Sequence, residues 1–219
     1  MMSEQLIGNI MNNVIARVRA ELEYAPGCHD FDHTLRVLRN AEKIAEELPE
    51  ANLQIVRLSA LLHDIARPEE MASKGAVCHA VLGIDKAEQI LTEFDCPKLF
   101  IPRVCACIGS HRFRGDGPEP ESVEAKIIFD ADKLDSIGAV GVGRAFHFAG
   151  RENARLHNTE QEAINSAPYS REDSAYREYL VKLRLLESRM LTLPGKKLAA
   201  ERAEFMHLFF RQLNREIYD

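Results

Sequence analysis

Long apolar runs are absent from this sequence, and none approaches the roughly 18 consecutive apolar residues that predict a transmembrane helix. The first residues, MMSEQLIGNIMNNVIARVR, alternate polar and apolar positions with a helical period and lack the continuous apolar region of a signal peptide. The five cysteines are an odd number and form no disulfide framework. These absences favour a cytoplasmic protein without a membrane partner.

Positively charged residues are fewer than negatively charged ones. The 28 Lys and Arg residues stand against 34 Asp and Glu residues, which gives a net charge of −6. This balance argues against general binding to nucleic acid polymers, which attract basic surfaces. With 46% hydrophobic residues, the chain can bury a substantial core, and we expect one domain over residues 1–219. The sequence leaves open whether the protein forms a homo-oligomer.

Strand-like alternation of polar and apolar residues is missing as well, and apolar residues instead recur at spacings of three and four. The pattern predicts an all-α fold. Loops are expected over Arg112–Glu121 and Arg151–Ser170, and the Pro194-Gly195 pair is expected to separate the last two helices. The expected helices run from Leu6 to Val18, Leu35 to Leu48, Leu53 to near Arg67, His79–Phe94, Lys98–Ser110, Glu124–Ser136, Val140–Gly150, Arg171–Met190 and Lys196–Ile217.

An adjacent His-Asp pair at the end of an apolar run is the first candidate for a functional site. His63-Asp64 follows the segment LSALL, and burial of two such polar groups is costly unless something satisfies them. A metal ion would do so. His29 and His33 stand four residues apart and share one face if they are helical. These residue types together indicate metal binding.

A second apolar run, residues 125–129, ends in three carboxylates, Asp130, Asp132 and Asp135, with Lys133 as the nearby cation. Imidazole and carboxylate ligands together suit a divalent transition metal such as Mn²⁺, Fe²⁺, Co²⁺, Ni²⁺ or Zn²⁺. Mg²⁺ remains open. The pattern therefore indicates a divalent metal ion, and four protein ligands would leave positions for water and substrate.

The order of these residues, His33, then His63-Asp64, then Asp132, resembles the H…HD…D pattern of the HD superfamily of metal-dependent phosphohydrolases. The flanking segments HDFDHTLRV, LLHDIAR and DADKLDSIGAVGVGRAF also look like those of the family. The resemblance covers roughly residues 28–150. It is strongest to the small single-domain bacterial members typified by nucleotide pyrophosphohydrolases.

The resemblance implies a helical HD-domain bundle over about residues 24–150, with a C-terminal helical extension over 171–217. It also implies one metal ion held by four side chains. Asp132 is preferred over Asp130 and Asp135 because the family's ligand lies in an Ala-Asp dipeptide. The implied ligands are His33, His63, Asp64 and Asp132.

Supporting roles follow from the same resemblance. The residues expected to orient the metal ligands without binding the metal are His29, Asp30 and Asp135. Asp30 matches the family's D-x-x-H motif, and Asp135 can accept a hydrogen bond from an imidazole. His79 and His111 lie where several family members carry extra histidines. We expect both to line the phosphate pocket as proton or hydrogen-bond donors, although they could instead bind a second metal ion.

Substrate contacts are expected from cationic side chains. Arg67 stands where a related branch has lysine in an HD-x-G-K motif, and this chain departs from it further with Ala66 in place of glycine. Arginine can still make bidentate contacts to phosphate. The residues expected to bind substrate are Arg67, Arg112, Arg114 and Lys133.

The predicted function is metal-dependent hydrolysis of a phosphate ester or anhydride, with Asp64 orienting or deprotonating the attacking water. By resemblance the substrate is a nucleotide, and cleavage of a nucleoside triphosphate to monophosphate and pyrophosphate is the first choice. The alternatives are a 5′-nucleotidase or other phosphomonoesterase, a guanosine polyphosphate hydrolase, and an inactive metal-stabilised binding protein. No G-x-S-x-G or S-x-x-K element supports a nucleophilic serine instead.

Overall fold

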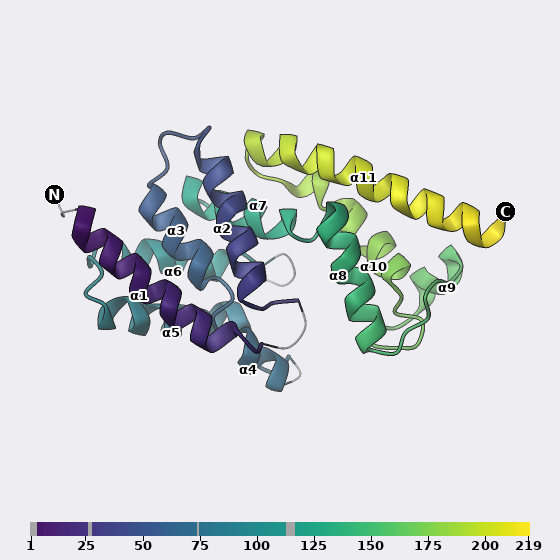
Figure 1. Ribbon diagram of the computed structural model, residues 1–219, viewed down its shortest axis with the longest axis horizontal. Helices are drawn as coiled ribbons and strands as arrows, with labels where there is room; N and C mark the ends of the chain where they lie inside the picture. The colour runs from purple at the N-terminus through teal and green to yellow at the C-terminus, as the bar shows by residue number, and fades with distance from the viewer. Residues whose placement is uncertain (1–3, 26–27, 74, 113–116) are drawn as a thin grey trace. The chain divides into compact units, whose positions relative to one another are not determined.

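The computed structural model describes residues 4–25, 28–73, 75–112 and 117–219. Within these ranges every regular element is helical, with eleven α-helices and two short 3₁₀ helices. Figure 1 shows the course of the helices along the chain. The all-α prediction is confirmed. The chain divides into two compact units, Met1–Asp132 and Lys133–Asp219.

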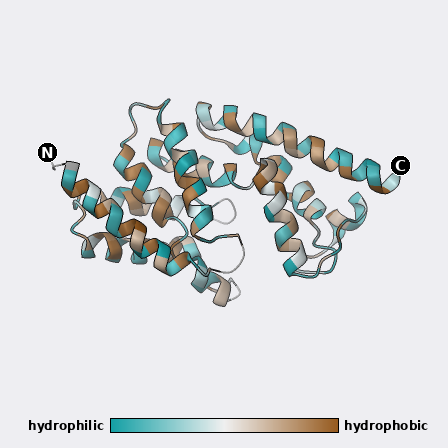
Figure 2. Ribbon diagram, in the orientation of Figure 1, coloured by the Kyte–Doolittle hydropathy of each residue, from teal (hydrophilic) through white to brown (hydrophobic). Residues whose placement is uncertain are grey.

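The first unit is built from amphipathic helices. Figure 2 shows hydrophobic and hydrophilic residues interleaved along these helices, as expected when each buries one face. Helix α2 packs against α3, and α5 packs against α6. The helices are α1 (Glu4–Leu22), α2 (Phe31–Ala45), α3 (Leu53–Leu62), α4 (Arg67–Ala72), α5 (His79–Glu93), α6 (Ile101–Ser110) and α7 (Val123–Leu134), whose last two residues belong to the second unit.

The starts of α2 and α3 are fixed by side-chain caps. The carboxylate of Asp30 accepts a hydrogen bond from the backbone N–H of His33 at 2.9 Å, and Asn52 caps α3 in the same way. His33 therefore lies in the first turn of α2. The chain leaves α3 after Leu62, so that His63 follows its last helical residue.

The expected end of α3 near Arg67 was wrong by about one turn. The helix ends at Leu62, and a turn leads to α4, which begins at Arg67 with Pro68 in its first turn. Proline is tolerated there because the first N–H groups of a helix have no partner within the helix. The proline therefore starts a new helix.

The second unit consists of α8 (Gly138–Arg151), α9 (Glu160–Asn165), α10 (Ala175–Val181), two 3₁₀ helices (Leu183–Leu185 and Glu187–Arg189) and α11 (Leu193–Tyr218). Helix α8 packs against α10 and α11. The buried side chains of this unit include Leu180, Met206 and Phe210. None of the described helices in either unit is long and apolar enough to cross a membrane.

Three expectations for the second unit were wrong. The expected loop Arg151–Ser170 contains α9, which Thr159 and Glu162 start with reciprocal capping hydrogen bonds. The expected helix Arg171–Met190 is broken into α10 and the two 3₁₀ helices. Pro194-Gly195 lies in the first turn of α11, because Thr192 caps the helix through the backbone N–H of Gly195.

Candidate metal centre

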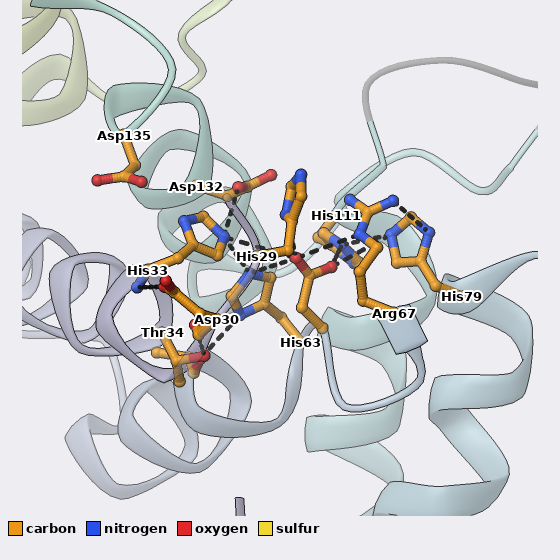
Figure 3. Close-up of polar contacts among 12 residues, drawn as sticks. His29, Asp30, His33, Thr34, His63, Arg67, His79, His111, Asp132 and Asp135 are labelled. Atoms are coloured by element: carbon orange, nitrogen blue, oxygen red, sulfur yellow. Dashed lines mark hydrogen bonds and ion pairs between the residues drawn. The ribbon is translucent and has the colours of Figure 1, made fainter. Parts of the chain in front are cut away.

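Four predicted metal ligands meet in the interior of the first unit (Figure 3). His33 comes from the first turn of α2, His63 and Asp64 follow α3, and Asp132 lies in α7. The side chains of His33 and His63 are completely buried. Segments about 30 and 70 residues apart in sequence are thus brought to one point, as the pattern of these residues predicted.

The ligand atoms of this group lie within a few ångströms of each other. His33 Nε2 is 3.2 Å from His63 Nε2, 3.5 Å from Asp64 Oδ2 and 3.6 Å from Asp132 Oδ1. His63 Nε2 is likewise 3.6 Å from Asp64 Oδ2. Nitrogen and oxygen donors that converge at such distances fit one divalent cation.

Hydrogen bonding sets the tautomer of His63. Its Nδ1–H donates to the carbonyl oxygen of Ala60 at 2.8 Å, so its Nε2 carries no hydrogen when the ring is neutral. Burial lowers the pKa of His63 to about 4. The ring is therefore neutral near pH 7, which is the form that binds metal ions, and its bare nitrogen faces His33.

Asp64 supplies a buried negative charge to this centre. Burial by itself would raise the pKa of its carboxyl group, but the Arg67 guanidinium and the imidazoles of His63 and His29 hold that pKa well below its usual range. Its Oδ1 is buried and makes no hydrogen bond to any residue that the structure describes. A buried, ionised oxygen of this kind is well suited to a cation.

A second group of possible ligands shares Asp64. His79 Nε2 and His111 Nε2 lie 3.2 Å apart, and they are 3.4 and 3.6 Å from Asp64 Oδ1. The Nδ1–H of His111 donates to the carbonyl oxygen of Ile108 at 2.6 Å. The structure thus brings together the three residues predicted to be catalytic, Asp64, His79 and His111. Burial lowers the pKa of His79 to about 4.

The three supporting residues lie in different surroundings. His29 Nδ1 is 2.7 Å from Asp64 Oδ2. Asp30 acts on His33 through its backbone N–H, as the cap described above. In the second unit, Asp135 pairs with Arg144 at 2.8 Å. His29 and Asp30 thus contact Asp64 and His33 directly, and the orienting role of all three residues stays a prediction.

The residues predicted to bind substrate also differ in their contacts. Arg67 Nε is 3.4 Å from Asp64 Oδ2, and its Nη1 donates to Glu70. Arg112 has an exposed side chain, whose Nη1 contacts Cys78 Sγ at 3.0 Å. Arg114 lies outside the described residues. Lys133 is buried in the second unit, which does not favour direct contact with a substrate, and its role stays a prediction.

Glu70 is a residue of this site that the sequence analysis missed. Its carboxylate lies 2.9 Å from His79 Nδ1 and accepts a hydrogen bond from Arg67. No motif contains Glu70. The one available signal is its spacing, because it stands three residues after Arg67 and such pairs face each other on a helix.

A cavity of about 650 Å³ lies elsewhere in the first unit, between α5, α6 and the segment that precedes α7. Apolar residues such as Ile84, Ile101 and Cys105 line much of it, and none of the clustered histidines does. Its lining includes Glu88, Glu119 and Glu121 but no histidine, so we assign the chemistry to the His and Asp cluster instead.

Comparison with known proteins identifies the family. The HD domain family matches residues 30–137. The uncharacterized protein YpgQ of Bacillus subtilis is 36% identical over 195 residues, which cover 86% of this chain and 84% of YpgQ. The chain belongs to the HD domain superfamily. The resemblance inferred from the sequence is confirmed, and the chain is a predicted hydrolase of that superfamily.

Solved structures support the same assignment for this HD protein. A crystal structure of Bacillus subtilis YpgQ in complex with ADP is similar with a TM-score of 0.75 and 31% identity, and the match covers 97% of both chains. An HD-superfamily hydrolase from Bacillus thuringiensis is similar with a TM-score of 0.72 and 26% identity, over 96% of this chain and 97% of the other. The similarity therefore includes both compact units.

Proposed function

We propose that this HD protein is a metal-dependent hydrolase that cleaves a nucleoside triphosphate to the monophosphate and pyrophosphate. The observation that carries the proposal is the buried convergence of four ligand side chains beside two further histidines and Arg67. The complex of YpgQ with ADP supports a nucleotide with a phosphoanhydride as the substrate class. The ligands are His33, His63, Asp64 and Asp132.

The donor set fits a divalent metal ion. It offers the bare Nε2 of His63 and the adjacent Nε2 of His33 together with two carboxylates, and Asp64 Oδ1 lacks a hydrogen-bond partner within the described residues. A divalent cation held there would supply Lewis acidity, which polarises a phosphoryl oxygen and offsets the charge that develops during hydrolysis. The donor types favour Mn²⁺, Fe²⁺, Co²⁺, Ni²⁺ or Zn²⁺, and leave Mg²⁺ open.

The chain's own residues supply the remaining chemistry. A water oxygen bonds to the α-phosphorus while the bond from this phosphorus to the α,β-bridging oxygen breaks. Pyrophosphate leaves with that electron pair, and the one proton that water loses goes to Nε2 of His79, which lies beside Nε2 of His111. Arg67 and Arg112 donate hydrogen bonds to phosphate oxygens.

An oxygen-18 experiment tests both the reaction and the bond that breaks. The purified protein is incubated with Mn²⁺, deoxyadenosine triphosphate and H₂¹⁸O, and the products are examined by ³¹P NMR and mass spectrometry. We expect pyrophosphate together with a monophosphate that carries one ¹⁸O. Adenosine monophosphate is supplied in parallel, and no orthophosphate is expected from it.

The outcomes separate the candidate reactions. Release of orthophosphate from the monophosphate would replace the proposal with a 5′-nucleotidase. Absence of hydrolysis for all nucleoside triphosphates, with Mn²⁺ or Co²⁺ present, would overturn it. Asp132→Asn serves as the inactive control, because it removes one charged ligand with little change in side-chain size, and it should abolish pyrophosphate release.

A further inference from the structure

Helix α4 places a largely buried carboxylate beside the predicted catalytic histidine. The side chain of Glu70 is 11% exposed, and its Oε2 is 2.9 Å from His79 Nδ1. The same oxygen accepts a hydrogen bond from Arg67 Nη1, and Oε1 lies 3.7 Å from Arg112 Nη2. One carboxylate thus contacts one imidazole and two guanidinium groups that were expected to act on the substrate.

The contact with Glu70 determines where His79 carries its hydrogen. Burial would raise the pKa of Glu70, but His79 and Arg67 hold it below its ordinary value, so Glu70 is ionised and accepts hydrogen bonds only. Two acceptors would repel each other at 2.9 Å, so we take Nδ1 of His79 as the donor to Glu70. Arg67 Nη1 lies 3.1 Å from that Nδ1 and can only donate, but its closer contact is with the Glu70 oxygen, and we assign its hydrogen to that carboxylate.

The other ring nitrogen of His79 is consequently left without hydrogen. It lies 3.2 Å from Nε2 of His111, which is also bare because the Nδ1–H of His111 donates to Ile108. Asp64 Oδ1 lies 3.4 Å from His79 Nε2. Three hydrogen-bond acceptors thus meet at one point, and a water molecule with two O–H groups can satisfy two of them. Figure 3 shows His79, His111 and Arg67 on the same side of the cluster.

We propose that Glu70 is a positioning residue for the hydrolysis proposed above: its carboxylate holds His79 as the Nδ1–H tautomer and thereby presents Nε2 as a hydrogen-bond acceptor to the attacking water. Glu70 does not touch the water itself. In this assignment neutral His79 accepts a hydrogen bond at Nε2, whereas the sequence led us to expect a donor. The assignment rests on the proposed function only for the identity of the reaction that His79 serves.

The adjacent carboxylate on the same helix provides a matched control. Glu69 pairs with Lys86 at 2.7 Å, and its side chain is 41% exposed. Glu69 has the same charge and size as Glu70 and belongs to the same short helix, but it forms its ion pair with Lys86, on α5, and not with His79. Glu69→Gln therefore measures the effect on activity and on the His79 tautomer of removing a carboxylate from α4 that does not contact His79.

The tautomer of His79 is measured by ¹⁵N NMR of histidine-labelled, full-length protein, both metal-free and loaded with diamagnetic Zn²⁺. The His79 signals are assigned from their loss in His79→Gln. We expect the Nδ1–H pattern in the wild type and in Glu69→Gln, and a shift towards the Nε2–H pattern in Glu70→Ala. An Nε2–H pattern in the wild type, or an unchanged pattern in Glu70→Ala, would overturn the proposal.

Kinetics test whether Glu70 acts through His79. Glu70→Ala should lower kcat about 10- to 100-fold, as for other residues that orient a functional histidine, with unchanged metal content. Glu70→Gln should recover part of that loss because its amide oxygen can still accept. In a His79→Gln background, Glu70→Ala should lower kcat by less than about twofold, because residues that act as one unit are not additive.

Several results would count against the proposal. Additive losses in the double variant, or wild-type kcat in Glu70→Ala, would reduce Glu70 to a structural ion pair. If the wild-type protein hydrolyses no nucleotide, the proposed function fails, and the NMR pattern alone decides whether Glu70 sets the tautomer of His79.

Discussion

Asp64 shows at the scale of one residue why this site could be found from the sequence. A buried carboxylate is costly without compensating charges, and here Arg67 and several imidazoles surround it. Among its neighbours in sequence, only His63 and Arg67 can offset the negative charge of Asp64. The His63-Asp64 pair could therefore be identified as functional from the sequence, and the remaining ligands followed from the resemblance to the HD superfamily.

Arg67 allows a prediction at this scale. Arg67→Ala should lower kcat/KM by about 1.5–3 kcal/mol, roughly 10- to 150-fold, because a charge-assisted contact to phosphate is lost. Metal content should not change, because Arg67 is not a ligand. Steady-state kinetics with a nucleoside triphosphate and elemental analysis of the same sample measure both quantities.

Arg57→Ala is the matched control for this prediction. Arg57 also forms an ion pair, with Glu42 at 2.7 Å, but neither residue belongs to the cluster. Arg57→Ala should leave kcat/KM within about twofold of the wild type, since partly exposed ion pairs contribute little to stability. Equal kinetics in Arg67→Ala and the wild type would show that Arg67 only joins Asp64 to Glu70.

At the scale of the helices, the ends of the elements decide what reaches the site. The cap at Asp30 places His33 in the first turn of α2, and the end of α3 at Leu62 places His63 and Asp64 in the turn that follows this helix. Periodicity in the sequence predicted the helices but not these ends. Helix α4 was missed because it is only six residues long, and with it Glu70.

Two glycines of α8 give a test of packing. A Cβ atom on Gly141 would lie 2.2 Å from the backbone oxygen of Ser136, whereas a Cβ atom on Gly143 meets nothing within 4 Å. Gly141→Ala should therefore destabilise the protein by about 1–3 kcal/mol, the usual range for overpacking. Gly143→Ala should stabilise it by about 0.5–1 kcal/mol, because alanine favours a helix interior.

Urea unfolding followed by circular dichroism measures both effects. The two variants should shift the midpoint in opposite directions at an unchanged slope. Equal midpoints for Gly141→Ala and Gly143→Ala would mean that the turn before α8 can shift without loss of stability. Glycine at position 141 would then not be required for packing.

At the scale of the whole molecule, the sequence predicted the first unit better than the second. The four ligands all lie within Met1–Asp132, where long amphipathic helices and the HD motifs point to the same answer. The second unit contains short helices, α9 and α10, and two 3₁₀ helices. Such elements are determined by local caps and tertiary packing. They are too short for the spacing of their apolar residues to predict a helix.

Metal binding should stabilise the folded chain, since the ligands come together only when it is folded. At a metal concentration about 100 times the Kd, the gain is about 2.7 kcal/mol, which corresponds to a rise in Tm of roughly 5–10 °C for a chain of this size. Thermal unfolding with Mn²⁺ and with a chelator measures it. The same Tm in both conditions would contradict a metal centre in the folded protein, and Asp132→Asn should show no rise.

The most direct test of the central claim is the number of metal ions that each chain retains. Protein equilibrated with Mn²⁺ and then desalted is measured by elemental analysis. We expect about one ion per chain, loss of it in alanine variants of His33, His63, Asp64 and Asp132, and retention in His111→Ala with a lower rate of hydrolysis. No retained metal, or about two ions that fall to one in His79→Ala or His111→Ala, would contradict this account.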